Sequence, residues 1–429
     1  MRHTVARERQ IRYRELRKAF SQISKRQLPD GYWRECLKWS NSPVENLTDK
    51  VEKYGHEDLP KISFWSATAV TSRTQGLVIA KFVPEKILAG SKPTVFLIEM
   101  NRLYATKSGE GRFKLVHPAM SVPEGKLFAC LMPNSSSAED EDYFKQDACI
   151  ASHFRKKEGR LRNGRSLAPL CARLPVACDG RNLTRNQKNT CAAFVPLADT
   201  NLYRLMHRNP SLGRLDQLGQ RASELLLQHW DWFSICLGLM HQLAVDLEIL
   251  HRRGIMHVDI KPENVLVYCV RDGSGKEQYD ARFTDFDLSA VLQRRTRFPG
   301  ADAYLGVTEQ YVDPLRDHAA VWETAVLTDI YSLGLVFKEM LWGPSSEPAN
   351  AAHRARTTRA QSLRPIATSN PAARIRETWR TGLSLEQHGP VSCVSLLIER
   401  MCNPMLGLRP SADEVARELE NIILYRGQA

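Results

Sequence analysis

The stretch HVDIKPEN, residues 257–264, constrains this chain more than any other part of its sequence. It places a carboxylate, a lysine and an amide close together, after a segment with apolar residues at helical spacing and before the apolar run VLV at 265–267. A polar insert at 271–281 follows, and after it comes the acidic run RFTDFDLS. The pattern predicts a helix, a polar loop and a strand in succession, with a second acidic loop shortly after them.

Three segments further along extend this pattern: TEQYVDP from Thr308, TDIYSLGLVFKEML from Thr328 and NPMLGLRPSADEV from Asn403. In this order the five segments resemble the protein kinases, whose motif set is H-R-D-x-x-x-x-N followed by D-F-G. The chain is identified as a divergent member of the eukaryotic-type serine/threonine kinase superfamily. The resemblance covers roughly residues 99–429. It implies an α+β bilobal fold, with a small β-rich N-lobe at about 99–198 and a larger helical C-lobe at about 199–429. Residues 1–98 are expected to form a basic N-terminal extension of unknown function.

The resemblance implies a role for each polar residue of the two loops. Asp259 and Lys261 would be catalytic: the first accepts or orients the hydroxyl proton, and the second neutralises charge near the γ-phosphate of ATP. Asn264 and Asp285 would hold a metal ion, Mg²⁺ or Mn²⁺. Asp329 would tie down the catalytic loop. His257, Phe286 and Ala151 would belong to the internal packing column that aligns the lobes.

Three positions depart from the family pattern. Val258 replaces the arginine that reads a phosphorylated activation loop, so control by loop phosphorylation is not expected. Asp287 replaces the glycine after Asp285-Phe286, which predicts a stiffer hinge or a second carboxylate near the metals. Leu315 stands where a glutamate pairs with the basic residue corresponding to Arg409, so that ion pair is expected to be weakened.

The ATP-binding lysine is missing from its usual place. Gly109 and Gly111 begin a pattern that resembles the glycine-rich loop, where small residues let backbone N–H groups approach phosphate. Counting fifteen residues from Val116 of that pattern ends at Leu131, which cannot bind phosphate. Lys114 occupies the place of the third glycine, an exchange that resembles the with-no-lysine kinases. The alternative interpretation is a solvent-exposed lysine in a degenerate loop.

The remaining ATP contacts are assigned by position in the same resemblance. Asp147, on a segment that reads as an amphipathic helix, would pair with Lys114. Glu141 is interpreted as a helix-start residue that interacts favourably with the helix dipole. Phe194 would be the bulky gatekeeper and Asn201 would reach a ribose hydroxyl. The adenine would contact the backbone from Val195 to Leu197 and the apolar side chains of Val116, Ala129, Leu202 and Leu266.

Three functions agree with these motifs. The first is an active protein kinase that phosphorylates serine or threonine hydroxyls of protein substrates, because Asp259, Lys261, Asn264 and Asp285 are all present. The second is a pseudokinase that acts as a scaffold or allosteric partner, which the missing lysine and third glycine favour. The third is a small-molecule kinase, suggested by the acidic DFD at 285–287.

Composition bears on the partners and the cellular location expected of this protein. The formal net charge is +12 and the hydrophobic fraction is 43%. The basic runs are interpreted as solvated surface rather than a specific nucleic-acid site. Ten cysteines without metal-ligand spacing predict reduced thiols and a cytoplasmic location, with a nuclear or secreted-effector setting as alternatives. No membrane span and no signal peptide are expected. The polar inserts and the N-terminal extension would offer surface to a regulatory partner.

Overall fold

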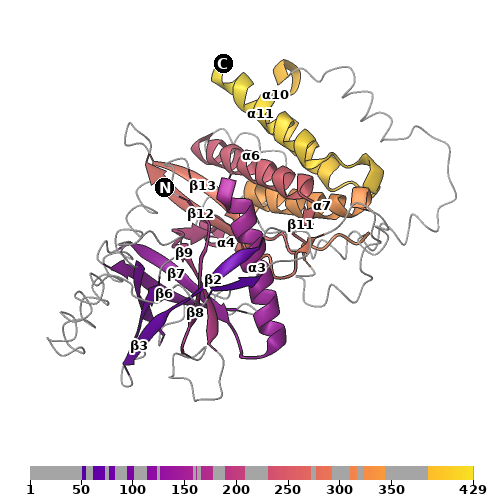
Figure 1. Ribbon diagram of the computed structural model, residues 1–429. Helices are drawn as coiled ribbons and strands as arrows, with labels where there is room; N and C mark the ends of the chain where they lie inside the picture. The colour runs from indigo at the N-terminus through magenta and orange to yellow at the C-terminus, as the bar shows by residue number, and fades with distance from the viewer. Residues whose placement is uncertain are drawn as a thin grey trace. The chain divides into compact units, whose positions relative to one another are not determined.

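The computed structural model describes residues 51–54, 61–72, 77–82, 94–100, 114–122, 126–157, 161, 166–176, 189–207, 230–271, 277–291, 310–315, 322–343 and 385–428. The chain divides into two compact units (Figure 1). The first comprises Met1–Asp199 with Arg271–Glu277, and the second comprises Thr200–Val270 with Gln278–Ala429. Each unit is described by itself.

The first unit is built on a nine-stranded sheet in the order β1-β2-β8-β9-β7-β6-β5-β4-β3. Neighbouring strands pair antiparallel except β2 and β8, which are parallel. The strands are β1 (Val51–Tyr54), β2 (Ile62–Ser66), β3 (Thr68–Ser72), β4 (Leu77–Phe82), β5 (Thr94–Glu99), β6 (Lys114–Val122), β7 (Leu127–Pro133), β8 (Leu170–Leu174) and β9 (Thr190–Pro196).

Side chains on both faces of the central strands β7 and β9 are buried or half-buried, which explains why these strands are apolar almost throughout. One face carries a core that includes Phe96, Cys130 and Phe194. On the other face, Ala193 and Cys171 pack with Phe144 of helix α3 (Ala138–Lys157). The helix begins at a defined cap, because the Ser137 hydroxyl accepts the Asp140 N–H at 3.1 Å.

The strands before residue 99 belong to the same sheet as those after it. The expected boundary between extension and kinase-like region at residues 98 and 99 falls within β5, which pairs with β6 from Val95 to Ile98. Strands β3 and β4 continue the sheet beyond β5, whereas β1 and β2 are added beside β8 at the other end. The boundary must therefore be corrected: the described residues 51–98 are part of the sheet.

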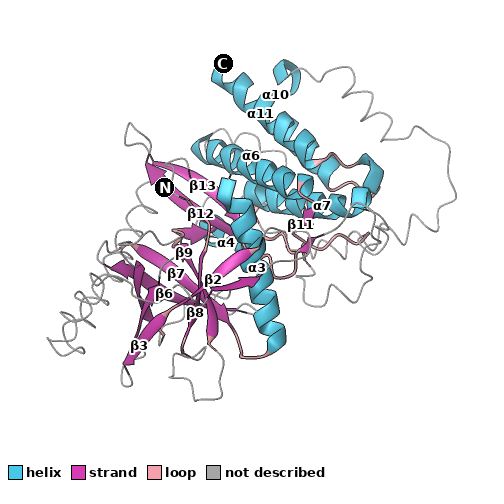
Figure 2. Cartoon of the chain, in the orientation of Figure 1, coloured by secondary structure: helices cyan, strands magenta, loops and turns pink. Residues whose placement is uncertain are grey.

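The second unit is mainly helical (Figure 2). Its helices are α4 (Leu202–His207), α6 (Trp230–Arg252), α7 (Trp322–Trp342), α10 (Leu385–Met401) and α11 (Ala412–Gln428), with short 3-10 turns η3 (Pro262–Asn264) and η6 (Leu406–Leu408). Strands β10 (Thr200–Asn201), β12 (Val265–Arg271) and β13 (Glu277–Phe283) form one sheet, and β11 (Ile255–Met256) pairs with β14 (Ala290–Val291).

Helices α6 and α7 form the centre of this unit. By length and composition alone, residues 232–252 of α6 could cross a membrane, but 67% of the apolar stretch is buried inside the structure, as in the core helix of a folded domain. Helix α11 starts with a reciprocal cap between Ser411 and Glu414, at 2.7 and 3.2 Å. A β-rich first unit followed by a helical second unit confirms the predicted α+β class.

Candidate active site

The catalytic loop is held by Asp329, a carboxylate that α7 places in the interior of the second unit. Its side chain is 1% exposed. One oxygen accepts the His257 N–H and the other accepts the Val258 N–H, each at 2.9 Å. The first oxygen also lies 3.0 Å from His251 Nε2, at the end of α6. The predicted anchoring of the loop by Asp329 is thus confirmed.

Val258 adopts a backbone conformation that β-branched residues avoid, with φ of 72°. The two bonds to Asp329 hold it there, because they fix the direction of consecutive N–H groups. Its side chain packs in an apolar cluster with Met256, Ala325 and Leu406. The position at which the family pattern has an arginine therefore contributes to packing in this chain.

The side chains of Lys261 and Asn264 both donate to Asp259. Lys261 Nζ donates to Asp259 Oδ2 at 2.6 Å. Asn264 Nδ2 donates to the same oxygen and to the Asp259 main-chain oxygen, each at 2.9 Å. Asp259 is 7% exposed, so these bonds fix the carboxylate in a largely desolvated setting. A carboxylate oriented in this way can accept or orient a hydroxyl proton, with a cation beside it to neutralise developing charge.

The second acidic loop, which contains Asp285, is hydrogen-bonded to the catalytic loop through backbone groups. Thr284 N–H donates to the Asn264 main-chain oxygen at 2.9 Å, which brings the residue before Asp285 against the catalytic loop. Asp285 has φ of 72°. Asn264 and Asp285 are oxygen ligands of the kind Mg²⁺ prefers, with substrate phosphates and water completing its shell. Across the described ranges, no group of three His, Cys, Asp or Glu side chains could hold a metal by itself.

His257, the first residue of the catalytic loop, contacts the second acidic loop. Its ring contacts Phe286 at a centroid distance of 5.1 Å, and its Nε2 lies 3.1 Å from the Thr284 carbonyl oxygen. Burial lowers the pKa of His257, an effect larger than the opposing influence of Asp329 and the other nearby carboxylates. The neutral ring therefore carries its proton on Nε2, since a carbonyl can only accept. His257 and Phe286 thus pack together, and the predicted column that would join them to Ala151 stays a prediction. Asp287 is buried, and its two predicted effects remain predictions.

In the first unit, Lys114 meets the partner expected for it. Lys114 Nζ lies 3.0 Å from Asp147 Oδ2 of α3, and both residues are buried. In the sheet, Val116 is opposite Leu131, so Lys114 two residues earlier projects from the same face as Leu131. Leu131 packs in the apolar cluster beneath α3. Gly109 and Gly111 lie outside the described residues, so their predicted role stays a prediction.

Of the apolar residues assigned to adenine, the two in the first unit, Val116 and Ala129, lie on one face of its sheet, whereas the predicted gatekeeper Phe194 lies on the other face. Ala129 is opposite Val195, so these side chains share the face that carries Lys114. Phe194, one residue earlier, projects from the other face and stacks on Phe96 at 4.2 Å. The prediction of Phe194 as gatekeeper is wrong, because a shift of one residue along a strand exchanges the faces.

Two further predicted ATP contacts, the Leu197 backbone for adenine and Asn201 for the ribose, make hydrogen bonds within the protein. The Leu197 N–H donates to the Leu127 carbonyl oxygen at 3.3 Å, and Pro196 has no N–H. In the second unit, Asn201 is opposite Leu266 in the β10–β12 pair. Asn201 Oδ1 accepts the Arg204 N–H at 2.9 Å and caps α4. These residues remain predicted ATP contacts.

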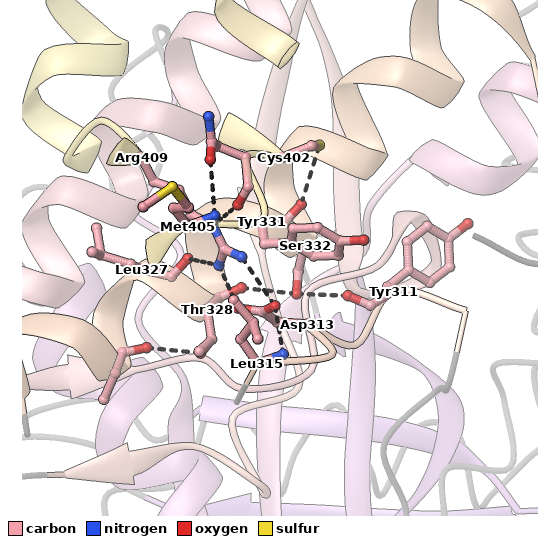
Figure 3. A network of polar contacts seen from close by, with 12 residues as sticks. Tyr311, Asp313, Leu315, Leu327, Thr328, Tyr331, Ser332, Cys402, Met405 and Arg409 are labelled. Atoms are coloured by element: carbon pink, nitrogen blue, oxygen red, sulfur yellow. Dashed lines mark hydrogen bonds and ion pairs between the residues drawn. The ribbon is translucent and has the colours of Figure 1, made fainter. Parts of the chain in front are cut away.

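A buried ion pair near the end of the 310–315 segment was missed by motif matching. Arg409 donates from two nitrogens to Asp313, and both side chains are fully buried (Figure 3). Its remaining donors reach the carbonyl oxygens of Leu327 at 3.0 Å and Asn403 at 2.8 Å. The expectation that Leu315 weakens this ion pair is therefore wrong, because Asp313 supplies the carboxylate. The signal in the sequence was an acid two residues before the substituted position.

Comparison with known proteins agrees with this arrangement. Residues 224–419 match the family model described as the protein kinase domain. Human 3-phosphoinositide-dependent protein kinase 1 is 32% identical over 104 residues, which cover 24% of this chain and 16% of the human protein. A probable serine/threonine-protein kinase of Clostridium perfringens is 30% identical over 111 residues, covering 26% and 14%. The serine/threonine-protein kinase PknD of Chlamydia pneumoniae is 31% identical over 116 residues, covering 24% and 12%.

The matched segments thus span less than a fifth of each of these relatives. The family match covers the catalytic loop, the second acidic loop, Asp329 and Arg409, whereas Lys114 and α3 lie before it. Together with the loop geometry described above, this match, which spans a little under half of the chain, supports membership of the protein kinase superfamily for residues 224–419.

Proposed function

We propose that this chain is an ATP-dependent protein serine/threonine kinase in which Lys114 takes over the role of the missing phosphate-binding lysine. The observation that supports retained chemistry best is the ordered trio of Asp259, Lys261 and Asn264, joined by bonds of 2.6 to 2.9 Å. A chain that had lost its chemistry would be under no requirement to keep a lysine and an asparagine side chain converging on this carboxylate.

The proposed roles follow from the chemistry of each group. Asp259 orients the substrate hydroxyl and takes its proton as the oxygen attacks phosphorus. Lys261 stabilises the negative charge that develops on the transferred phosphoryl group. Asn264 and Asp285 would hold Mg²⁺ or Mn²⁺, which supplies charge neutralisation between the phosphates. The Asn264 amide already donates through Nδ2 to Asp259, so Oδ1 is the atom suited to a metal.

Lys114 is proposed to bind the non-transferred phosphates. Its ammonium group is ion-paired and buried at 3.0 Å from Asp147, which keeps the long side chain in one orientation. An exposed lysine in a degenerate loop, the alternative interpretation, would make no buried ion pair with a helix carboxylate. The pair therefore favours a binding role for Lys114 over chance placement.

A pseudokinase is the second candidate, favoured by Leu131 at the usual lysine position and by Val258 in its apolar cluster. In that case the chain would act as a scaffold, with a regulatory partner bound at the inserts or the N-terminal segment. We also propose a cytoplasmic location: none of the cysteines in the described part of the chain forms a disulfide, and most are buried.

The deciding experiment is transfer of labelled γ-phosphate from ATP to a general basic protein acceptor, in Mg²⁺ and in Mn²⁺. Wild type is compared with Asp259→Asn, and phosphoamino-acid analysis identifies the acceptor hydroxyl. We expect transfer to serine or threonine that falls by on the order of 10²–10³ in the variant. Transfer by neither protein would refute the kinase and leave the scaffold.

Lys114→Met tests the relocated lysine, with Lys126→Met as the matched control because Lys126 is an exposed lysine of the same hairpin. We expect Lys114→Met to weaken ATP binding and turnover, and Lys126→Met to change neither. Equal ATP affinity and turnover in the two variants would refute the role of Lys114 while leaving the kinase proposal standing.

A further inference from the structure

Glu141, near the start of α3, connects that helix to two strands of the first sheet. Glu141 Oε1 accepts from Lys145 Nζ and from Arg173 Nη2 of β8, each at 2.7 Å. The Cys191 thiol of β9 lies 3.7 Å from the same oxygen. Arg173 is fixed in turn, because its Nη1 donates to the Asn189 carbonyl oxygen at 2.9 Å. Glu141 therefore does more than interact with the helix dipole: it attaches α3 to the sheet.

The charge on Glu141 is maintained in this setting. Burial alone raises the pKa of the carboxyl, but the hydrogen bonds from Lys145 and Arg173 outweigh it, and the pKa lies below its ordinary value. An ionised acceptor makes both bonds charge-assisted, which roughly doubles their strength relative to neutral bonds. The attachment is thus present at neutral pH.

The N-terminal strands β1 and β2 support the same helix from a second direction. Tyr54 of β1 places its ring 5.6 Å from Lys145 Nζ. Tyr54 and Phe64 pack with Phe144 in the cluster beneath α3. Strand β2 is itself fixed by parallel pairing with β8, where Trp65 is opposite Ala172. Strands β1 and β2 and the Glu141 contacts therefore all hold the N-terminal part of α3.

The position of α3 matters because Asp147 has little reach. Aspartate is shorter than glutamate by one carbon–carbon bond, about 1.5 Å. An outward shift of α3 by that length would stretch the contact between Lys114 and Asp147 from 3.0 Å to about 4.5 Å, beyond the range of an ion pair. Glu141 lies six residues before Asp147, about 9 Å along the same rigid helix, so its attachment limits this shift.

We propose that Glu141 is a positioning residue for the Lys114–Asp147 pair, and that strands β1 and β2 act with it as a built-in brace that keeps α3 in place. The inference rests on the proposed role of Lys114. It assigns to the described part of the N-terminal segment the function of holding the ATP-binding lysine ready without a separate partner. Glu141 acts through α3 and does not contact ATP.

The test compares Glu141→Gln with Glu139→Gln, an exposed acid in the same first turn that serves as the matched control. Two quantities are measured on the full chain. The first is the acylation rate of Lys114 by an amine-reactive ester, read by mass spectrometry against the exposed Lys126. The second is the dissociation constant for ATP with Mg²⁺. The acylation rate does not depend on ATP binding.

We expect Glu141→Gln to raise the acylation rate of Lys114 and to weaken ATP binding by about fivefold or more, in the range typical of coupled sites. Adding Asp147→Glu to Glu141→Gln should restore both, because the longer carboxylate compensates for a displaced helix. A purely structural role for Glu141 would lower thermal stability without rescue by the longer side chain.

Tyr54→Leu provides an independent variant in case Glu141→Gln fails to fold, and it should change both quantities in the same direction. The proposal is overturned if Glu141→Gln or Tyr54→Leu matches Glu139→Gln in Lys114 acylation, or if Asp147→Glu restores nothing. If wild type neither binds ATP nor transfers phosphate, the kinase proposal fails, and the acylation rates still decide whether Glu141 positions the pair.

Discussion

The buried pair of Arg409 and Asp313 leads to the sharpest prediction. Replacing Asp313 with asparagine keeps the shape of the side chain and removes its charge. Arg409 would then be left as a buried cation with only neutral acceptors, the carbonyl oxygens of Leu327 and Asn403 and the Tyr331 ring, whose centroid lies 4.9 Å from the guanidinium carbon.

The expected cost follows from complete burial, since both side chains are 0% exposed. Removing one partner of a buried pair destabilises a protein by about 3–5 kcal/mol, because the remaining charge has lost its compensation. For a unit of about 150–250 residues, each kcal/mol lowers the unfolding temperature by about 2–4 °C. Asp313→Asn should therefore lower it by about 6–20 °C.

The assay is thermal unfolding followed by circular dichroism, and the chain offers a matched control. Asp413 and Arg417 form an ion pair of the same chemistry at 2.7 Å, but with exposed fractions of 57% and 64%. Asp413→Asn should cost no more than about 0.5 kcal/mol. The double variant Asp313→Leu with Arg409→Met should recover much of the loss, because it leaves no unpaired charge. Equal costs for Asp313→Asn and Asp413→Asn would refute the reasoning.

Three further predictions concern the catalytic loop. Val258→Asn should cost less than about 1 kcal/mol, because relief of the strained φ offsets the lost packing, whereas Val267→Asn, fully buried in regular β12, should cost several times more in urea unfolding. His257→Phe should remove a pH-dependent loss of folding stability. Because the pKa of His257 is lowered in the native state, the unfolded chain takes up the proton first, and the free energy of unfolding of wild type falls as pH drops below about 6.5. Its stability relative to the variant should therefore shrink between about pH 7.5 and 5. Phosphatase treatment should leave phosphate transfer unchanged, because the position usually occupied by a phosphate-reading arginine belongs to an apolar cluster; a loss of activity would contradict this.

The parts of the site that the sequence predicts correctly are mostly local. Asp259, Lys261 and Asn264 lie within one short loop, so their convergence follows once the loop turns through η3. The Lys114–Asp147 pair is not local, and the sequence indicated it only through the family resemblance, in which Asp147 falls where the family has a glutamate.

The predictions that failed depend on strand register and on contacts between residues far apart in the sequence. Phe194 was assigned to the wrong face of β9 because an error of one residue reverses every side chain of a strand. Asp313 was missed because its partner lies 96 residues away, and no local pattern links the two. The strands before residue 99 were assigned to a separate extension because an apolar run indicates a strand but does not say which strand it pairs with.

The Arg409–Asp313 pair and the proposed role of Lys114 share one physical explanation, which can itself be tested. Asp313 stands in for a carboxylate two residues later, and Lys114 is proposed to stand in for a lysine one strand away, on the same face of the sheet. The fold constrains where a charge must lie, and more than one backbone position can deliver it.

Returning the lysine to its usual place, with Leu131→Lys in a Lys114→Met background, should therefore recover part of the ATP affinity lost in Lys114→Met. Recovery is expected to be partial, because Leu131 packs beneath α3 and its replacement removes apolar contact there. Calorimetric titration with ATP would measure it, and no recovery in a folded double variant would show that the two positions are not equivalent.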